Sequence, residues 1–221
     1  MRHLLYLIAT LLPWPLRRRV LIAVFDYKID PQSRIGFAWV MPEQLIMDRD
    51  SSIGTLTVCK GIKLLHLKQN ASIGRANWIT GFPAGPHRHF AHQPDRKPEL
   101  IVGEHSAITN RHILDCTNSV SIGAFSTFAG FRSQILTHSI DLENCRQSSA
   151  PITIGAYSFV GTDCVLLGGS SLPDHSVLAA KSLLNKSYGD PFWLYGGVPA
   201  RPLSQISRDA GYFSRTTGFV Y

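Results

Sequence analysis

A histidine in a polar segment is the residue of this chain whose setting most suggests catalysis. His138 stands in the sequence Thr137-His138-Ser139, directly after Ile135-Leu136, and opens a polar segment. The acidic residues Asp141 and Glu143 follow closely and are able to orient an imidazole ring. An unperturbed imidazole titrates near pH 6.5, which suits a general base working at neutral pH. We therefore expect His138 to take a proton from a substrate.

Three further histidines, His87, His89 and His92, lie together with the spacing H-x-H-x-x-H. Such a cluster can supply ligands for a metal ion. The plainer interpretation is a polar insertion between structural elements. We favour the insertion, and no metal is expected.

Cysteine spacing and net charge narrow the classes of protein. No two cysteines have the C-x-x-C spacing of a zinc knuckle or a redox dithiol, so we expect free thiols in a reducing, cytoplasmic compartment. The 221 residues carry a net charge of +7, which suits an anionic ligand, membrane or nucleic acid. The one basic run is Arg17-Arg18-Arg19, without interleaved aromatic residues. Nucleic acid is therefore not an expected partner. The four cysteines are Cys59, Cys116, Cys145 and Cys164.

The elements that position His138 are indicated by a repeat with a period of six. A single strand has a period of two and a single helix a period of 3.6, so neither explains it. A chain that turns a corner every six residues, with one side chain pointing inward on each face, does explain it. Three such faces make one coil of a parallel β-helix, the solenoid that hexapeptide repeats encode. The repeat comprises Ile154, Val160, Leu166, Leu172, Leu178 and Leu184.

Earlier residues extend the repeat toward the N-terminus. Two more runs of aliphatic or aromatic residues have the same spacing of six, but the second of them starts two residues out of phase with the first. We expect such breaks in the spacing to mark loops that leave the coil. The two largest gaps, 82–99 and 137–151, are the expected loop insertions, and loops on a solenoid usually carry the function. The second run is Val102, Ile108, Leu114 and Val120, the third is Ile122 and Phe128, and further coil starts are expected at Ile35-Gly36, Ile53-Gly54 and Ile73-Gly74.

The sequence thus predicts a mainly β protein, a parallel β-helix over residues 31–186. Residues 1–30 form an N-terminal segment and residues 187–221 a C-terminal extension. Two interpretations of the apolar first 25 residues remain open. They form a short helical cap on the open end of the solenoid, or an interfacial segment with its arginines on anionic lipid and Trp14 at the headgroups. The interfacial interpretation places the protein at the inner face of the membrane.

Residues 100–206 resemble the hexapeptide-repeat acyltransferases with a left-handed β-helix. The resemblance rests on the segments LTHSID, PITIGAYSFVG, VLAAKSLLNK and YGGVPARPL, in that order and spacing. Within that superfamily the segment is most similar to sugar O-acetyltransferases of the galactoside, maltose and colanic-acid or capsule type. The resemblance implies a homotrimer and acetyl-CoA as the co-substrate. It also implies direct attack on the thioester by the hydroxyl of a sugar, glycolipid or polysaccharide precursor.

The resemblance also implies roles for particular residues, with His138 as the general base. Asn110 and Asp115 would line the acceptor pocket, together with Asp141 and Glu143 of the loop. The residues that would bind acetyl-CoA are Phe159, Gly161, Thr162, Ala179, Ala180, Lys186 and Arg201.

A different class of function is a non-catalytic β-helical scaffold or a metal-dependent hydrase. A scaffold needs neither His138 nor paired cations. The related β-helical carbonic anhydrases need a second histidine five residues after the first, where this chain has Glu143. The acyltransferase interpretation is therefore the one that we carry forward.

Overall fold

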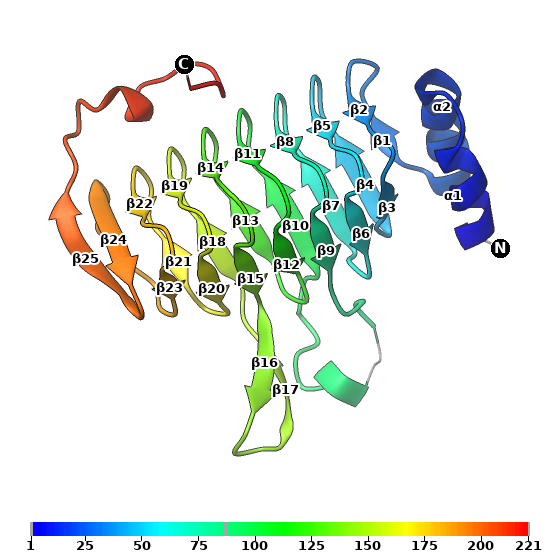
Figure 1. Cartoon of the computed structure of the whole chain (residues 1–221). Helices are drawn as coiled ribbons and strands as arrows, with labels where there is room; N and C mark the ends of the chain where they lie inside the picture. The colour runs from blue at the N-terminus through cyan, green and yellow to red at the C-terminus, as the bar shows by residue number, and fades with distance from the viewer. Residues whose placement is uncertain (1, 86–87, 221) are drawn as a thin grey trace.

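The computed structural model describes residues 2–85 and 88–220 and is dominated by a three-sided stack of short parallel strands (Figure 1). Each coil contributes one strand to each of three sheets, which we call A, B and C in the order in which the chain visits them. Sheet A contains β1 (Lys28–Ile29), β4 (Gln44–Met47), β7 (Leu64–Leu67), β10 (Glu99–Val102), β13 (Val120–Ile122), β18 (Ile152–Ile154) and β21 (Ser171–Leu172).

Sheets B and C complete the three sides. Sheet B contains β2 (Arg34–Ile35), β5 (Ser52–Ile53), β8 (Ser72–Ile73), β11 (Ala107–Ile108), β14 (Thr127–Phe128), β19 (Phe159–Val160), β22 (Val177–Leu178), β24 (Trp193–Gly197) and β25 (Ala200–Gln205). Sheet C contains β3 (Trp39–Met41), β6 (Val58–Lys60), β9 (Trp78–Thr80), β12 (Ile113–Asp115), β15 (Gln134–Leu136), β20 (Val165–Leu167) and β23 (Leu183–Leu184).

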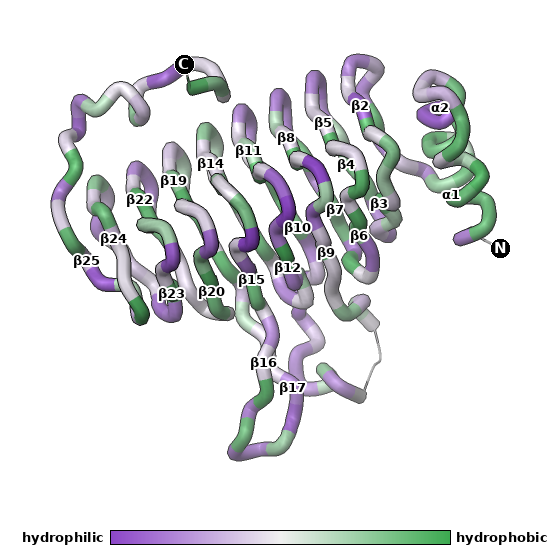
Figure 2. The backbone as a smooth tube through the Cα atoms, viewed as in Figure 1, coloured by the Kyte–Doolittle hydropathy of each residue, from purple (hydrophilic) through white to green (hydrophobic). Residues whose placement is uncertain are grey.

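The period of six arises because one aliphatic side chain per face fills the interior. All six members of the repeat from Ile154 to Leu184 are at most 2% exposed, and they pass in turn through sheets A, B and C. Hydrophobic positions consequently alternate with polar corners along the stack (Figure 2). The shift between Val120 and Ile122 is not a loop, contrary to expectation. Both residues belong to β13, and both point inward from that strand.

Close stacking of the coils requires small residues at some corners. A Cβ atom added to Gly155 would lie 2.4 Å from the backbone nitrogen of Asp174 in the next coil. No side chain larger than hydrogen fits at that distance unless the backbone moves. Where a small residue follows an inward aliphatic residue, as Gly155 follows Ile154, it allows this close approach of neighbouring corners.

Two helices, α1 (Arg2–Thr10) and α2 (Trp14–Phe25), cover the open end of the first coil (Figure 1). The Arg17 guanidinium is 3% exposed and donates to the backbone oxygens of Gly36 at 2.7 Å and Ala38 at 2.8 Å. The Tyr6 hydroxyl accepts a hydrogen bond from the Val40 N–H at 3.1 Å. These side chains satisfy backbone groups that would otherwise pair with a preceding coil.

These contacts limit which of the side chains named in the lipid interpretation, Trp14 and the arginines, are available to a membrane. Trp14 is half-buried, and its indole N–H donates to the Ser33 oxygen at 3.1 Å. Arg18 donates to the oxygens of Ile29 and Asp30, so only Arg19 of the three is exposed. No helix among the described residues is long and apolar enough to cross a membrane.

The chain after the last coil extends sheet B and then turns back across the corners that join sheets A and B (Figure 1). Five aromatic rings stack along these corners, each from a residue with φ between 52° and 62°. Phe213 packs edge-on against two of the rings, and Arg215 donates to the Phe125 oxygen and lies over the Tyr157 ring. The stacked rings belong to His105, Phe125, Tyr157, His175 and Phe192.

Candidate active site

The corners at which the chain passes from sheet C to sheet A lie above one another and form a column along the stack. Both expected insertions leave the stack at this column. The first lies between β9 and β10 and contains a short 3₁₀-helix (Arg88–Phe90). The second is a hairpin of β16 (His138–Asp141) and β17 (Arg146–Ser149). The two insertions belong to this one column, with the short corner between β12 and β13 lying between them, and they project from the same side of the stack (Figure 1).

Reciprocal hydrogen bonds join the two insertions. The Gln93 side chain donates to the Ser149 oxygen at 3.0 Å and accepts from the Ser149 N–H at 3.1 Å. The buried Arg96 donates to the oxygens of Phe82, Pro83 and Thr117, so that it fixes the first insertion to a coil. Burial lowers the pKa of the Arg96 guanidinium, and the Asp115 carboxylate opposes that shift.

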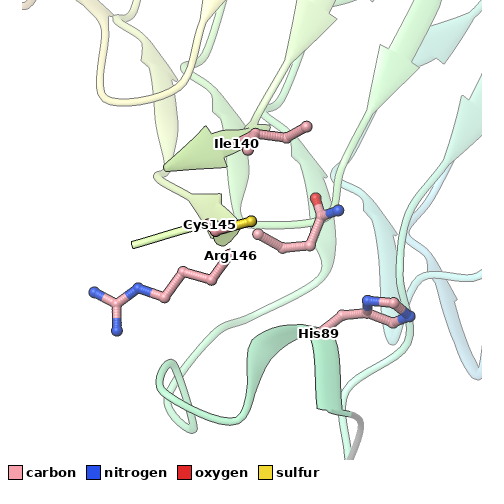
Figure 3. A pocket seen from close by; sticks show the side chains of 5 residues that line it. His89, Ile140, Cys145 and Arg146 are labelled. Carbon is pink, nitrogen blue, oxygen red and sulfur yellow. The ribbon is translucent and has the colours of Figure 1, made fainter. Parts of the chain in front are cut away.

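An open pocket of about 330 Å³ lies between the hairpin and the first insertion (Figure 3). Ile140, which lines it, is two residues from His138 and therefore on the same face of β16. The pocket thus adjoins the side of the hairpin from which His138 projects. Its lining residues are His89, Ile140, Cys145, Arg146 and Gln147.

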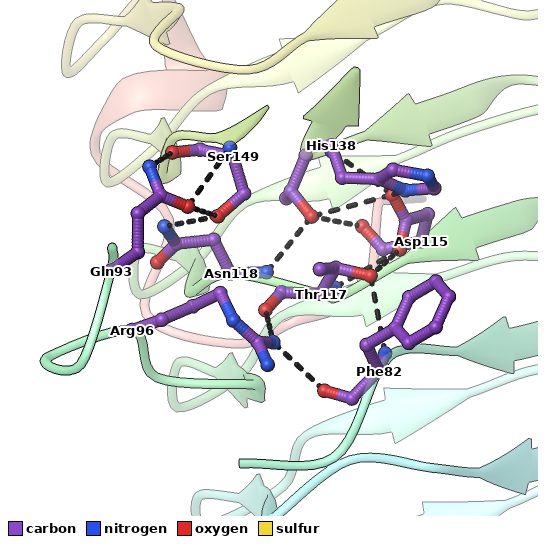
Figure 4. A network of polar contacts seen from close by, with 9 residues as sticks. Phe82, Gln93, Arg96, Asp115, Thr117, Asn118, His138 and Ser149 are labelled. Carbon is purple, nitrogen blue, oxygen red and sulfur yellow. Dashed lines mark hydrogen bonds and ion pairs between the residues drawn. The ribbon is translucent and has the colours of Figure 1, made fainter. Parts of the chain in front are cut away.

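His138 lies at the base of the hairpin and is held by Asp115 (Figure 4). Nδ1 of the imidazole is 2.7 Å from Oδ2 of Asp115, which also accepts the His138 backbone N–H at 3.1 Å. Oδ1 accepts the N–H and the hydroxyl of Thr117, at 3.0 and 2.5 Å. An ionised carboxylate accepts hydrogen bonds only, so Nδ1 carries the hydrogen, and in the neutral imidazole the lone pair is then on Nε2.

Two phenylalanines of the first insertion surround the imidazole. The rings of Phe82 and Phe90 lie edge-on to it, with centroid distances of 5.8 and 6.4 Å. The His138 side chain nevertheless remains 34% exposed. The site therefore combines an oriented imidazole, an apolar wall and access for a substrate, which is the arrangement that a general base requires.

The structure assigns the orienting contact to Asp115 rather than to Asp141 or Glu143. Asp141 is engaged at the far end of the hairpin, where Asn144 and Arg146 lower the pKa of its carboxyl group. Glu143 lies beyond it, in the exposed turn. Asp115 was expected in the acceptor pocket and is brought to His138, whereas Asn110 lies at the other end of β12 and accepts the Arg75 N–H at 2.9 Å.

The residues expected to bind the donor divide between two columns of corners. Gly161, Thr162, Ala179 and Ala180 lie where sheet B leads into sheet C, on the far side of sheet C from His138. Phe159 lies on β19, which leads into that column. Lys186 lies in the same column as His138, two coils further along, or roughly 10 Å at the usual strand spacing. Arg201 is on β25, opposite Gly196.

The structure adds Thr117, Phe82, Phe90, Gln93 and Arg96 to the site that the sequence predicts. The pairing of His138 with Asp115 could have been predicted from the register of the coils. Asp115 pairs with Leu136 in the neighbouring strand and therefore lies one coil below His138. The other residues are in a loop insertion, which follows no repeat. Of the histidine-rich segment, His87 lies outside the described residues, and no group of three metal ligands occurs among the residues that are described.

Comparisons with known proteins address the fold. No protein-family model matches the sequence, and no curated protein matches it. A hexapeptide-repeat acetyltransferase from Vibrio cholerae superposes over 93% of this chain and 88% of its own, with a TM-score of 0.50 and 17% identity. The same protein complexed with acetyl-CoA is 27% identical over 49% of this chain and 61% of its own, with a TM-score of 0.46.

A third solved structure is an N-acyltransferase, AntD, from Bacillus cereus in complex with dTDP and coenzyme A. It superposes over 86% of this chain and 89% of its own, with a TM-score of 0.52 and 11% identity. The chain therefore has the left-handed parallel β-helix fold of the hexapeptide-repeat acyltransferases. The fold expected from the period of six is confirmed.

Proposed function

We propose that the protein is an acyltransferase that moves an acetyl group from acetyl-CoA to a hydroxyl of a sugar, glycolipid or polysaccharide precursor. The observation that carries the proposal is the His138–Asp115 pair, on the same face of the hairpin as Ile140, which lines an accessible pocket. The fold is in keeping with it, since the Vibrio cholerae and Bacillus cereus proteins are acyltransferases described with acetyl-CoA or coenzyme A.

His138 performs the proton transfers in the proposed reaction. Nε2 takes the proton of the acceptor hydroxyl as its oxygen attacks the thioester carbonyl. Asp115 stabilises the imidazolium that forms, through the hydrogen bond to Nδ1. When the carbon–sulfur bond breaks, the imidazolium returns the proton to the departing thiolate. The acetyl group passes directly to the acceptor, without a covalent bond to the protein.

The pocket beside His138 is the proposed acceptor site. Ile140 offers apolar surface, and Gln147 and Arg146 offer polar groups. That combination suits a sugar, which has apolar faces and hydroxyl edges. The same imidazole could take a proton from an amine, so the acceptor assay includes amino sugars.

A homotrimer would bring the two columns of donor-binding residues together. Within one coil, the corners before and after a strand of sheet C are six residues apart, hence at most about 20 Å. In one chain the two columns therefore lie along opposite edges of sheet C. The outward positions of sheet C are mainly apolar, which favours contact with a second chain. These positions include Trp39, Met41, Val58, Trp78, Ile113, Leu136, Val165, Leu167 and Leu183.

The test of the proposed activity is release of free thiol from acetyl-CoA in the presence of sugars, sugar nucleotides, lipid-linked sugars and amino sugars. The variant His138→Ala should lower turnover by ~10²–10⁴-fold and leave acetyl-CoA binding unchanged. His66→Ala is the matched control, because His66 also contacts a carboxylate, Asp48 at 3.0 Å, but on sheet A. Equal turnover in His138→Ala and wild type would refute the proposed base.

Light scattering tests the proposed assembly separately. We expect three times the mass of one chain at working concentration. A monomer that is fully active would show that one chain binds both substrates without its neighbours.

A further inference from the structure

The two N-terminal helices expose an apolar surface to solvent. The buried side of this cap carries Tyr6, Arg17, Leu21 and Phe25. Eight of the twenty large apolar side chains that are exposed in the described residues come from this short segment, and Figure 2 shows hydrophobic colouring over most of α1 and part of α2. We call them the cap face: Leu4, Leu5, Leu7, Ile8, Leu11, Leu16, Ile22 and Val24, which are 36–71% exposed.

The cap face is apolar, whereas the end of a solenoid in water requires a polar outer surface. A terminal cap keeps a polar outer surface, because its outer side has no further coil to cover it. Here the charged Arg17 is turned inward onto backbone oxygens, and aliphatic side chains are turned outward. An exposed apolar area of this kind marks a surface that meets a partner or a membrane.

The charges around the cap face select the kind of partner. Residues 1–25 contain no aspartate or glutamate. Arg19 is exposed on α2, one turn from Leu16, and Lys28 and Arg34 are exposed on the first coil. Helices that present aliphatic residues among arginines and lysines bind in the interface of anionic bilayers without crossing them. The lengths of α1 and α2, 9 and 12 residues, fit this position.

A second copy of the chain fits the cap face less well. Pairing of two cap faces would bring one Arg19 toward the other, and the first acidic residue available, Asp26, follows the end of α2. A bilayer with anionic headgroups supplies negative charge at any position and hydrocarbon for the aliphatic side chains. We propose that the cap face docks the protein on an anionic phospholipid surface, a property separate from the proposed catalysis.

Sedimentation of the full-length chain with vesicles tests this docking. Vesicles of phosphatidylcholine are compared with vesicles that also contain phosphatidylglycerol. We expect binding to the anionic vesicles to be at least tenfold stronger and to weaken as salt is raised. The double variant Leu7→Glu, Leu11→Glu should lose at least tenfold in binding, and Arg19→Gln about fivefold, since one basic residue contributes about that factor at an anionic surface.

Leu203→Glu is the matched control, because Leu203 is 57% exposed on β25, at the other end of the stack. It should bind the vesicles as the wild type does, and circular dichroism should show that every variant is folded. Absence of wild-type binding to anionic vesicles would overturn the proposal. It would also be overturned if the double variant bound normally, or if its only effect were to lower the oligomeric state in light scattering.

Discussion

The substitution Asp115→Asn keeps the size of the side chain that holds His138 and removes its charge. The carboxylate accepts two hydrogen bonds from Thr117, two from His138 and a longer one, at 3.5 Å, from the Thr137 hydroxyl. An amide has one oxygen and one NH₂ group, so its NH₂ group must face donors on one side or the other. If the oxygen faces Thr117, Nδ1 of His138 can only accept, and its hydrogen moves to Nε2. The atom proposed to take the substrate proton is then blocked.

The size of the effect follows from the lost contact. A hydrogen bond to a charged group contributes about 1.5–3 kcal/mol, and this one is needed most when the imidazolium forms. Because 1.36 kcal/mol corresponds to a factor of ten in rate, the lost contact alone predicts a fall of about 10- to 150-fold. The altered tautomer adds to that loss. We therefore expect kcat to fall by about 100-fold or more.

Thiol release at saturating acetyl-CoA measures this change, with the acceptor that the wild type uses. The KM for acetyl-CoA should stay close to the wild-type value, because Asp115 contacts the imidazole and not the proposed donor site. Asp48→Asn is the control, since Asp48 makes the comparable contact with His66 outside the site. A folded Asp115→Asn variant with wild-type kcat would refute the orienting role of Asp115.

Three further predictions concern the donor, the stack and pH. Lys186→Ala and Arg201→Ala should each raise the KM for acetyl-CoA several-fold with little change in kcat, because contacts with distant phosphates contribute equally to ground and transition states; unchanged KM values would remove these residues from the donor site. Gly155→Ala should lower the free energy of unfolding by about 1–3 kcal/mol, as measured in urea, whereas Gly189→Ala, with no atom within 4 Å of an added Cβ, should not. Burial lowers the pKa of His112 to about 4, so the unfolded chain gains a proton that the folded chain lacks as pH falls from 6.5 to 4. Stability should fall by up to about 3 kcal/mol over that range, and His112→Asn should abolish this part of the pH dependence in urea titrations.

The coils were predictable because the same physical requirement recurs on every face. One inward aliphatic side chain per face and a small residue at many corners leave a mark in the sequence at fixed intervals. The shift at Val120 and Ile122 was misinterpreted because strands of sheet A bury two side chains. A period of six does not distinguish a wide face from a loop.

The partner of His138 was harder to predict, since neighbours in a solenoid are one coil apart rather than adjacent in sequence. Asp115 is 23 residues before His138 and one coil below it, whereas Asp141 is three residues away and at the far end of a strand. The inward orientation of the Arg17 side chain could not be predicted for a related reason. A run of arginines beside aliphatic residues indicates lipid or solvent unless the unpaired backbone oxygens of the first coil are known.

The C-terminal tail changes how the solenoid can come apart. Coils that contact only their immediate neighbours can fray one at a time from an open end. Here Phe213 holds the corners at His175 and Phe192, Arg215 holds the corner at Phe125, and Gly218 lies against His105. The last coil cannot open until the tail detaches from corners far below it. The C-terminal half of the stack is thereby made to unfold as one cooperative unit, so that exchange of its amide hydrogens should report a shared opening rather than a gradient toward the end.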